Sequence, residues 1–434
     1  MSAIRRVTGW EALDSRGRPT VAARVELADG SRGTALVPSG ASAGSHEALE
    51  LRDGEGRYGG RGVRRAVENV NLALADAVRG LEPDQVDAAL ASADPSAGFQ
   101  VLGANALLAV SVAAARAAAR SEGVSLARYL AGRDRADQTT RPLLLPMPMV
   151  NVLSGGAHAG AMLDVQDFLV VPVGAGSIAE AIEWSVAVRD AAREVALRQG
   201  HPEAVLVADE GGLGLALSSN RAAVELLTEA IETAGYEPGT QLAIAIDVAA
   251  SEFYRDGAYR LASEDRTLSA EELVEEISQW CAQFPVVSVE DILAEDDWAG
   301  WARATAALGG QIELVGDDLF VTDPARLARG ISGNVANSVL VKVNQNGLLS
   351  GAKSVVDAAR AAGYRTVVSA RSGETEDSWL ADLAVGWRAG QIKVGSTHRS
   401  ERTAKWNRLL ELEATEDTTF AGPWNHGRPD RSTT

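Results

Sequence analysis

Four short apolar segments in the second half of the chain each end on an ionisable residue. They read LAIAID to Asp247, VVSVED through Glu290, IELVGD to Asp317 and SVLVK to Lys342, and a fifth segment, GQIKVG, carries Lys393. Such runs are typical of parallel strands buried on both faces, and folds built from them perform chemistry at the carboxyl ends of the strands. We therefore expect three carboxylates and two ammonium groups to converge.

The three carboxylates predict a magnesium site. They are separated by about one strand–helix unit each, and hard oxygen ligands from separate strands suit Mg²⁺, which keeps waters that a substrate can displace. Histidine or cysteine would indicate zinc, but neither occupies these positions. The alternative is that each acidic residue only caps the following helix. That alternative explains one such residue better than it explains three together with two lysines.

The two lysines, Lys342 and Lys393, indicate proton abstraction. A lysine beside Mg²⁺ and another cation holds its proton less tightly, because like charge disfavours the ammonium form. It can then act as a general base near neutral pH. The matching reaction removes a proton next to a carboxylate, and metal ions stabilise the enolate that forms.

Composition limits the partners and the compartment. The net charge of −18 argues against nucleic acid or an anionic membrane as a partner, since both require a basic face. The single cysteine, Cys281, cannot form an internal disulfide, which is typical of a reducing compartment. The first residues, MSAIRRVTGW, show no export segment, and no window is apolar enough to span a membrane. We expect a cytoplasmic protein with a small anionic substrate.

The sequence divides into four parts. Residues 1–131 contain strand-like alternation with a hairpin signal at Asp29-Gly30, a glycine-rich loop at 37–45 suited to mobility, and an alanine-rich helical stretch. Residues 132–141 form a polar linker, and residues 142–413 alternate strand and helix, which favours an α/β barrel. Residues 414–434 are polar and turn-rich, so we expect a disordered tail.

The chain resembles the enolase family over residues 4–413. The resemblance implies an N-terminal α+β domain that caps an enolase-type (β/α)8 barrel with one antiparallel strand, and a homodimer or larger homo-oligomer. The matching segments are ALDSRGRPTV (12–21), VPSGASAG (37–44), HEALELRD (46–53), GGAHAG (155–160), DEGG (209–212), DVAASEFY (247–254), VGDDLFVT (315–322), KVNQNG (342–347), RSGETED (371–377), GQIKVG (390–395) and RSER (399–402).

This resemblance implies two Mg²⁺ ions. Asp247, Glu290 and Asp317 would bind the first, and Ser42 in the glycine-rich loop would help to hold the second once substrate is bound.

The resemblance also implies roles around a 2-phosphoglycerate-like substrate. Lys342 would remove the C2 proton, and Glu210 would assist departure of the C3 hydroxide as a general acid. Lys393 would hold a substrate oxygen, while Arg371 and Ser372 would bind the phosphoryl group. Independently of the resemblance, an arginine next to Ser-Gly and just before a helix is suited to binding a phosphate group.

The departures from the family pattern gather at the same site. Ala370 stands where enolases have an active-site histidine, and both it and Asp167 reduce bulk. Asp167 stands where they have a catalytic-site glutamate, so the resemblance implies that Asp167 is catalytic. His158 in the GGAHAG loop would close over this region, although a structural loop histidine is the simpler interpretation of His158 alone.

These departures leave several functions open. The favoured one is a specialised relative that resembles carboxyphosphonoenolpyruvate synthase of phosphonate and phosphinate natural-product pathways. The alternatives are an ordinary enolase (phosphopyruvate hydratase) and a non-catalytic binding protein on the same scaffold. A cycloisomerase or racemase of the same superfamily fits less well, because Gln166 and Asp167 stand where those enzymes carry a lysine pair.

Overall fold

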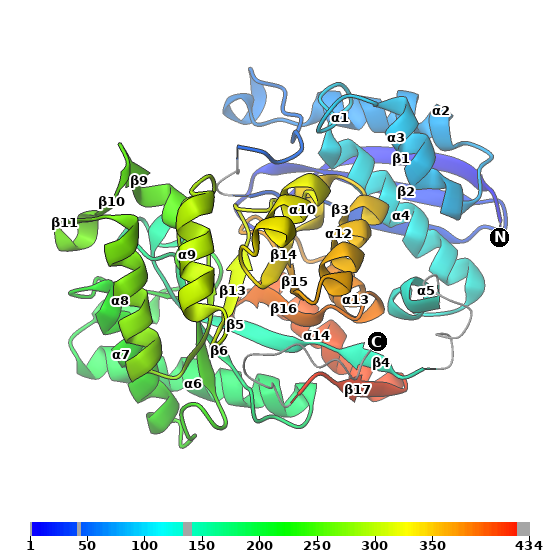
Figure 1. Ribbon diagram of the computed structural model, residues 1–434. Helices are drawn as coiled ribbons and strands as arrows, with labels where there is room; N and C mark the ends of the chain where they lie inside the picture. The colour runs from blue at the N-terminus through cyan, green and yellow to red at the C-terminus, as the bar shows by residue number, and fades with distance from the viewer. Residues whose placement is uncertain (1, 41–44, 133–140, 423–434) are drawn as a thin grey trace.

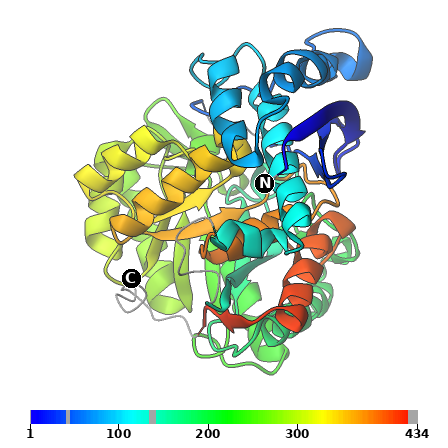
Figure 2. The same ribbon diagram turned by 90° about the vertical axis from the view of Figure 1, so that its right-hand side faces the viewer.

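The computed structural model describes residues 2–40, 45–132 and 141–422 and shows two domains, an N-terminal α+β domain and a barrel (Figure 1). Figure 2, turned by 90°, shows the N-terminal domain, in blue and cyan, packed beside the barrel rather than inserted into it. Among the described residues, no helix combines the length and the apolar character needed to cross a membrane.

The N-terminal domain packs a three-stranded antiparallel sheet on an alanine-rich helix. The hairpin at Asp29-Gly30 is confirmed, with Gly30 at φ +90° and the backbone N–H of Ser31 donating to the Asp29 carboxylate at 2.8 Å. Gly33 lets the helix approach closely, because a Cβ there would lie 2.0 Å from the Ala113 carbonyl oxygen. The elements are β1 (Ile4–Leu13), β2 (Pro19–Leu27), β3 (Arg32–Leu36), η1 (Arg57–Gly60), α1 (Arg64–Asn69), η2 (Val70–Leu74), α2 (Ala75–Val78), η3 (Pro83–Gln85), α3 (Val86–Ala93), α4 (Ala104–Glu122) and α5 (Leu126–Gly132).

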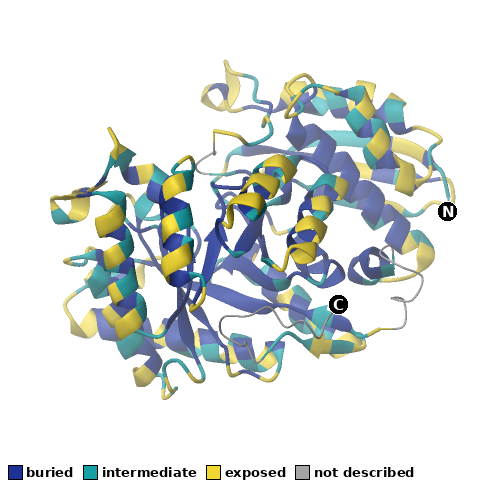
Figure 3. Ribbon diagram, viewed as in Figure 1, coloured by how far each residue is buried: buried dark blue, intermediate teal, exposed yellow. Residues whose placement is uncertain are grey.

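Eight strands close into a barrel, because the last of them, β16, pairs with the first, β5. Strand β6 runs antiparallel to both of its neighbours, β5 and β8, as the resemblance implied. The strands are buried along their length, as expected for a sheet covered on both faces (Figure 3). They are β5 (Met147–Ser154), β6 (Asp167–Val171), β8 (Ala243–Asp247), β12 (Val286–Glu290), β13 (Glu313–Gly316), β14 (Ser338–Val341), β15 (Arg365–Ser369) and β16 (Gly390–Gly395).

Helices cover the outside of the barrel and expose only their outer faces (Figure 3). Several begin with a side-chain cap; at α8, Ser269 and Glu272 form a capping box. The helices are η4 (Gly156–His158), α6 (Ile178–Arg198), η5 (Pro202–Val205), α7 (Asn220–Thr233), η6 (Ala250–Phe253), η7 (Ala262–Glu264), α8 (Ala270–Gln283), α9 (Trp298–Leu308), α10 (Pro324–Gly333), α11 (Val343–Asn346), α12 (Leu349–Ala361), α13 (Trp379–Gly386) and α14 (Ser400–Thr415). Short strands complete the domain: β4 (Leu143–Leu145), β7 (Leu213–Gly214), β9 (Tyr254–Arg255), β10 (Ala258–Leu261), β11 (Arg266–Leu268) and β17 (Thr418–Phe420).

The expectation of a disordered tail from residue 414 is wrong for its first part. Helix α14 continues to Thr415, and β17 pairs in parallel with β4. Glu416 Oε2 forms an ion pair with Arg128 Nη2 at 3.1 Å, and Phe420 packs on the core. A three-residue strand is too short to show a periodicity, which is why the sequence did not reveal it. Residues 423–434 lie outside the described residues, as do 133–140 of the expected linker.

The barrel interior contains a buried carboxyl group at the amino end of β13, away from the carboxyl ends of the strands. Glu313 is 2% exposed and accepts a hydrogen bond from Gln391 Nε2 at 2.7 Å. Because β13 and β16 are not neighbours, this contact crosses the inside of the barrel. Burial raises the pKa of Glu313, although the charge of Arg365 opposes the rise.

We predict that Glu313→Gln stabilises the fold at alkaline pH. A carboxyl group with a raised pKa in the folded state supports folding below its usual titration range, and this contribution is lost as the pH rises through the folded-state pKa. The variant should therefore gain about 1–3 kcal/mol over the parent at high pH, the usual cost of an unsatisfied buried polar group. Urea unfolding at acidic and alkaline pH measures the difference, and an equal gain at both would contradict it.

Candidate active site

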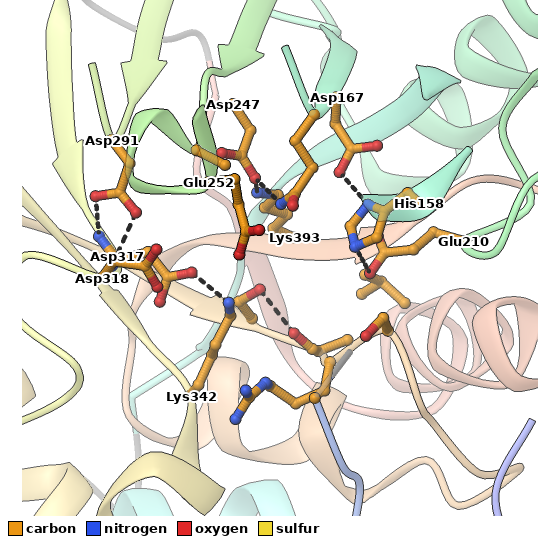
Figure 4. Close-up of a pocket in the computed structure, with 18 residues that line it drawn as sticks. His158, Asp167, Glu210, Asp247, Glu252, Asp291, Asp317, Asp318, Lys342 and Lys393 are labelled. Carbon is orange, nitrogen blue, oxygen red and sulfur yellow. Dashed lines mark hydrogen bonds and ion pairs between the residues drawn. The ribbon is translucent and has the colours of Figure 1, made fainter. Parts of the chain in front are cut away.

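The carboxyl ends of the barrel strands surround a pocket of about 540 Å³, part of it open to solvent (Figure 4). Asp247 and Glu290 are the last residues of β8 and β12, while Asp317 and Lys342 directly follow β13 and β14. Lys393 lies within β16. The structure therefore brings all five residues to the same end of the barrel, where the sequence predicted them.

Lys393 joins two of the carboxylates. Its Nζ lies 2.7 Å from Asp247 Oδ2 (Figure 4). It also lies 2.7 Å from Glu290 Oε2, and all three residues are buried. Gln166 Nε2 donates to the same Asp247 oxygen at 3.0 Å. Burial disfavours the ammonium form, but the charges of Asp247 and Glu290 outweigh burial and raise the pKa of Lys393. Lys393 is therefore a fixed positive charge in this arrangement.

Lys342 pairs with the third carboxylate, Asp317, which also accepts a hydrogen bond from Gln345 Nε2 at 3.0 Å. Burial lowers the pKa of Lys342, but the Asp317 charge outweighs burial and the net pKa is raised. A general base needs the opposite shift. The carboxylates alone do not provide it, whereas the positive charge of a metal ion beside Lys342 would shift its pKa in that direction.

A second layer of acidic residues supports Asp317. Asp291 accepts hydrogen bonds from the backbone N–H groups of Asp317, at 3.0 Å, and of Asp318, at 2.8 Å, and it adopts a positive φ of 43°. Burial and the neighbouring Asp317 charge raise the pKa of Asp318 to about 7. The sequence analysis missed this layer, although Asp291 directly follows Glu290 in the VVSVED segment.

The donor set fits a divalent cation that prefers oxygen. Glu290 Oε1 is buried and has no hydrogen-bond partner among residues 2–40, 45–132 and 141–422. Burial and the Asp247 charge raise the pKa of Glu290 well above the usual glutamate range, and the positive charge of Lys393 does not offset this rise. Among the described residues, oxygens of Asp291, Asp317 and Asp318 lie within 4.8 Å of one another, whereas the predicted set of Asp247, Glu290 and Asp317 does not form such a group, because Lys393 and Lys342 hold these carboxylates as ion pairs. A cation shared by Asp247, Glu290 and Asp317 would replace the two lysines as their counter-charge.

The expected phosphoryl end lies beside β15. Arg371 is 4% exposed, and its two terminal nitrogens bind the Glu47 carboxylate at 3.0 and 3.1 Å, while Asn344 accepts a further hydrogen bond at 2.9 Å. Ala370 and Ser372 line the pocket on either side of Arg371. Glu47 and Asn344 were not predicted, although they lie in the HEALELRD and KVNQNG segments.

His158, Asp167 and Glu210 form a second cluster of residues that lines the pocket. His158 Nδ1 lies 2.8 Å from Asp167 Oδ2, and His158 Nε2 lies 3.8 Å from Glu210 Oε1 (Figure 4). Burial disfavours the imidazolium, but the charges of Asp167 and Glu210 outweigh it and raise the pKa of His158 to about 9. Burial also opposes ionisation of Glu210, yet His158 and Arg402 lower its pKa.

Ser42, expected at the second metal, lies outside the described residues. The preceding segment is anchored by Arg16, whose Nη2 donates to the carbonyl oxygens of Ser39 at 3.1 Å and Gly40 at 2.9 Å. Ser39 also pairs with Gly373, next to Ser372. The glycine-rich loop therefore begins directly at the phosphoryl end of the pocket.

This fold and site define a barrel with carboxylates and lysines gathered at the carboxyl ends of its strands, where barrel enzymes carry their active sites. The chain matches the family model described as Enolase, N-terminal domain, over residues 4–130. It also matches the model described as Enolase, C-terminal TIM barrel domain, over residues 142–426. The chain therefore belongs to the enolase family, whose members generally use Mg²⁺ and perform lyase-type chemistry.

Proposed function

We propose that this protein is a Mg²⁺-dependent enzyme that removes the C2 proton of a 2-phosphoglycerate-like substrate and forms an enolpyruvyl product. The observation that carries the proposal is the ring of carboxylates and lysines at the strand ends. Asp247, Glu290 and Asp317 would hold Mg²⁺, which supplies positive charge next to the enolate oxygens. A second ion would bind through Ser42 and the substrate.

The two lysines would act on the same carbon skeleton. Lys342, next to Asp317, would accept the C2 proton once metal charge lowers its affinity for protons. Lys393 would stay charged and hold a substrate carboxylate oxygen, because its pKa is raised. Glu210 would lie near the C3 hydroxyl beside His158, and this pair of residues would supply the proton for the departing oxygen. Each group thus faces a different part of the substrate.

The phosphoryl group would bind at Arg371 and Ser372. Because the Glu47 carboxylate already binds both terminal nitrogens of Arg371, a substrate anion must either share the guanidinium with Glu47 or displace the Glu47 carboxylate. Ala370 offers only a methyl group to this end of the pocket. We therefore favour a larger phosphonate-type substrate, as in carboxyphosphonoenolpyruvate synthase.

Phosphorus NMR separates the possible substrates. The protein is incubated with Mg²⁺ and 2-phosphoglycerate, with and without a nucleotide-activated phosphonoformate. A new carbon–phosphorus species that needs both substrates supports the specialised enzyme. Phosphoenolpyruvate alone identifies an ordinary enolase, and no conversion under either condition favours a non-catalytic binding protein.

We predict that Ala370→His lowers conversion of the larger substrate. The imidazole would fill space that the methyl group leaves open, and overpacking costs about 1–3 kcal/mol, or about 5- to 150-fold in rate. Ala370→Gly is the matched control, because it keeps the space and should retain activity. If Ala370→His instead raises turnover of 2-phosphoglycerate, the ordinary enolase function is favoured.

We also propose a cytoplasmic homodimer or larger homo-oligomer that binds neither nucleic acid nor membranes. The net charge of −18 supports the last two points.

A further inference from the structure

Asp167 was expected to be catalytic, but its carboxylate is held entirely by protein groups. The residue is 0% exposed. Oδ1 accepts hydrogen bonds from Ser154 Oγ at 3.0 Å and from Asn151 Nδ2, and Oδ2 lies 2.8 Å from His158 Nδ1. Both oxygens are therefore engaged before any substrate arrives.

The antiparallel strand produces this arrangement. In the register of β5 and β6, Ser154 lies directly opposite Asp167, and Asn151 lies three residues earlier in β5. His158 follows in η4 and folds back over the end of β6. A parallel strand at this position would not bring the two strand ends, and hence these four side chains, together.

The Asp167 carboxylate determines which ring nitrogen faces the pocket. An ionised carboxylate only accepts hydrogen bonds, so His158 Nδ1 must carry a proton and donate it. Nε2 then points to the Glu210 side, 3.8 Å from Glu210 Oε1. A carboxylate that orients a histidine in this way also stabilises its charged form.

We propose that Asp167 is a positioning residue: Asn151 and Ser154 fix its carboxylate, and the carboxylate orients His158. In this orientation His158 Nε2–H, and not Glu210, protonates the departing C3 oxygen. This inference rests on the proposed function. In the reaction, Lys342 takes the C2 proton, the electron pair left on C2 forms the C2=C3 double bond, and the C3–O bond breaks with its pair on oxygen. The oxygen takes the proton from Nε2 and leaves as water, and neutral His158 regains a proton from solvent.

The charges around His158 support this assignment. Asp167 faces it from β6, Glu210 from the loop before β7 and Asp247 from β8; all three favour the imidazolium and outweigh burial in raising its pKa to about 9. Burial opposes ionisation of Glu210, but the charges of His158, Arg402 in α14 and Lys393 in β16 outweigh burial and lower the pKa of that carboxyl group. At neutral pH the proton therefore belongs to His158.

Nitrogen-15 NMR of labelled histidine tests the positioning role without substrate. The chain has five histidines, and His158→Gln identifies the His158 signals. We expect His158 in the parent protein to titrate near 9 and in Asp167→Asn to titrate at a clearly lower pH, because the variant loses the charge of Asp167. Ser154→Ala removes only one support, so it should shift the titration less. A His158 pKa in the usual histidine range in the parent protein, or the same His158 pKa in the parent and in Asp167→Asn, would overturn the proposal. This holds whether or not the proposed reaction occurs.

The pH dependence of kcat tests the proton-donor role. Loss of a general acid should lower kcat about 10²–10⁴-fold, so His158→Gln should lose this factor together with the alkaline limb of the profile. Asp167→Asn should move that limb to lower pH with little change in KM, a shift that a merely structural defect would not produce. If Glu210→Gln removes the limb while His158→Gln keeps it, Glu210 is the donor and the proposal fails.

Discussion

Lys342→Ala is expected to lower kcat by about 10²–10⁴-fold, the usual contribution of a general base, with a much smaller change in KM. Lys342 directly follows β14, and its ammonium nitrogen contacts Asp317, which directly follows β13. The proposed function places the carbon that loses its proton within reach of this nitrogen. No other lysine can replace it, because Lys393 is held between Asp247 and Glu290. The rate of enolpyruvyl product formation measures the effect.

A matched control and a folding check accompany this variant. Lys353 lies in helix α12, pairs with Asp357 at 2.8 Å and is remote from the pocket, so Lys353→Ala should keep full activity. Lys342→Ala also removes a positive charge next to Asp317, so its affinity for Mg²⁺ should be retained or increased. An inactive variant that still binds Mg²⁺ is folded and lacks only the base. Full activity in Lys342→Ala would exclude Lys342 as the base.

Glu290→Gln is expected to remove most of the stabilisation that Mg²⁺ gives the folded protein. A ligand that binds only the folded state adds about 2.7 kcal/mol at a concentration of 100 times its Kd. Glu290 has one buried oxygen without a hydrogen-bond partner in the described part of the chain and a pKa raised by burial and by Asp247. A cation relieves both conditions, and an amide in place of the carboxylate cannot attract it as strongly.

Chemical unfolding with and without Mg²⁺ measures this effect. Glu313→Gln is the matched control, since it removes a buried carboxyl group from the neighbouring strand β13 but at the amino end of that strand, away from the proposed metal site. This control should keep the full response to Mg²⁺. Equal responses in Glu290→Gln and the parent protein would show that Glu290 is not a metal ligand.

The sequence predicted the parts of the site that follow directly from strand ends. Runs such as LAIAID end in a carboxylate and are apolar throughout, so both the strand and its functional end can be recognised from local pattern. β8 and β12 accordingly end at Asp247 and Glu290. The alanine-rich helix α4 and the Asp29-Gly30 hairpin were predicted for the same reason, since their signals are local.

Features that depend on long-range pairing could not be predicted in this way. The segment DFLVV reads like any buried strand, so the antiparallel direction of β6 came only from the resemblance. The Glu47–Arg371 pair joins residues 324 positions apart. The partners of Asp167 depend on the register of β5 and β6, which no local pattern specifies.

The most direct test of the central claim is the exchange of the C2 hydrogen of 2-phosphoglycerate with solvent in D₂O, followed by proton NMR. The arrangement of Lys342 beside the carboxylates predicts deuterium incorporation that requires both Mg²⁺ and Lys342. Exchange that persists in Lys342→Ala, or its absence in the Mg²⁺-loaded parent protein, would contradict the account.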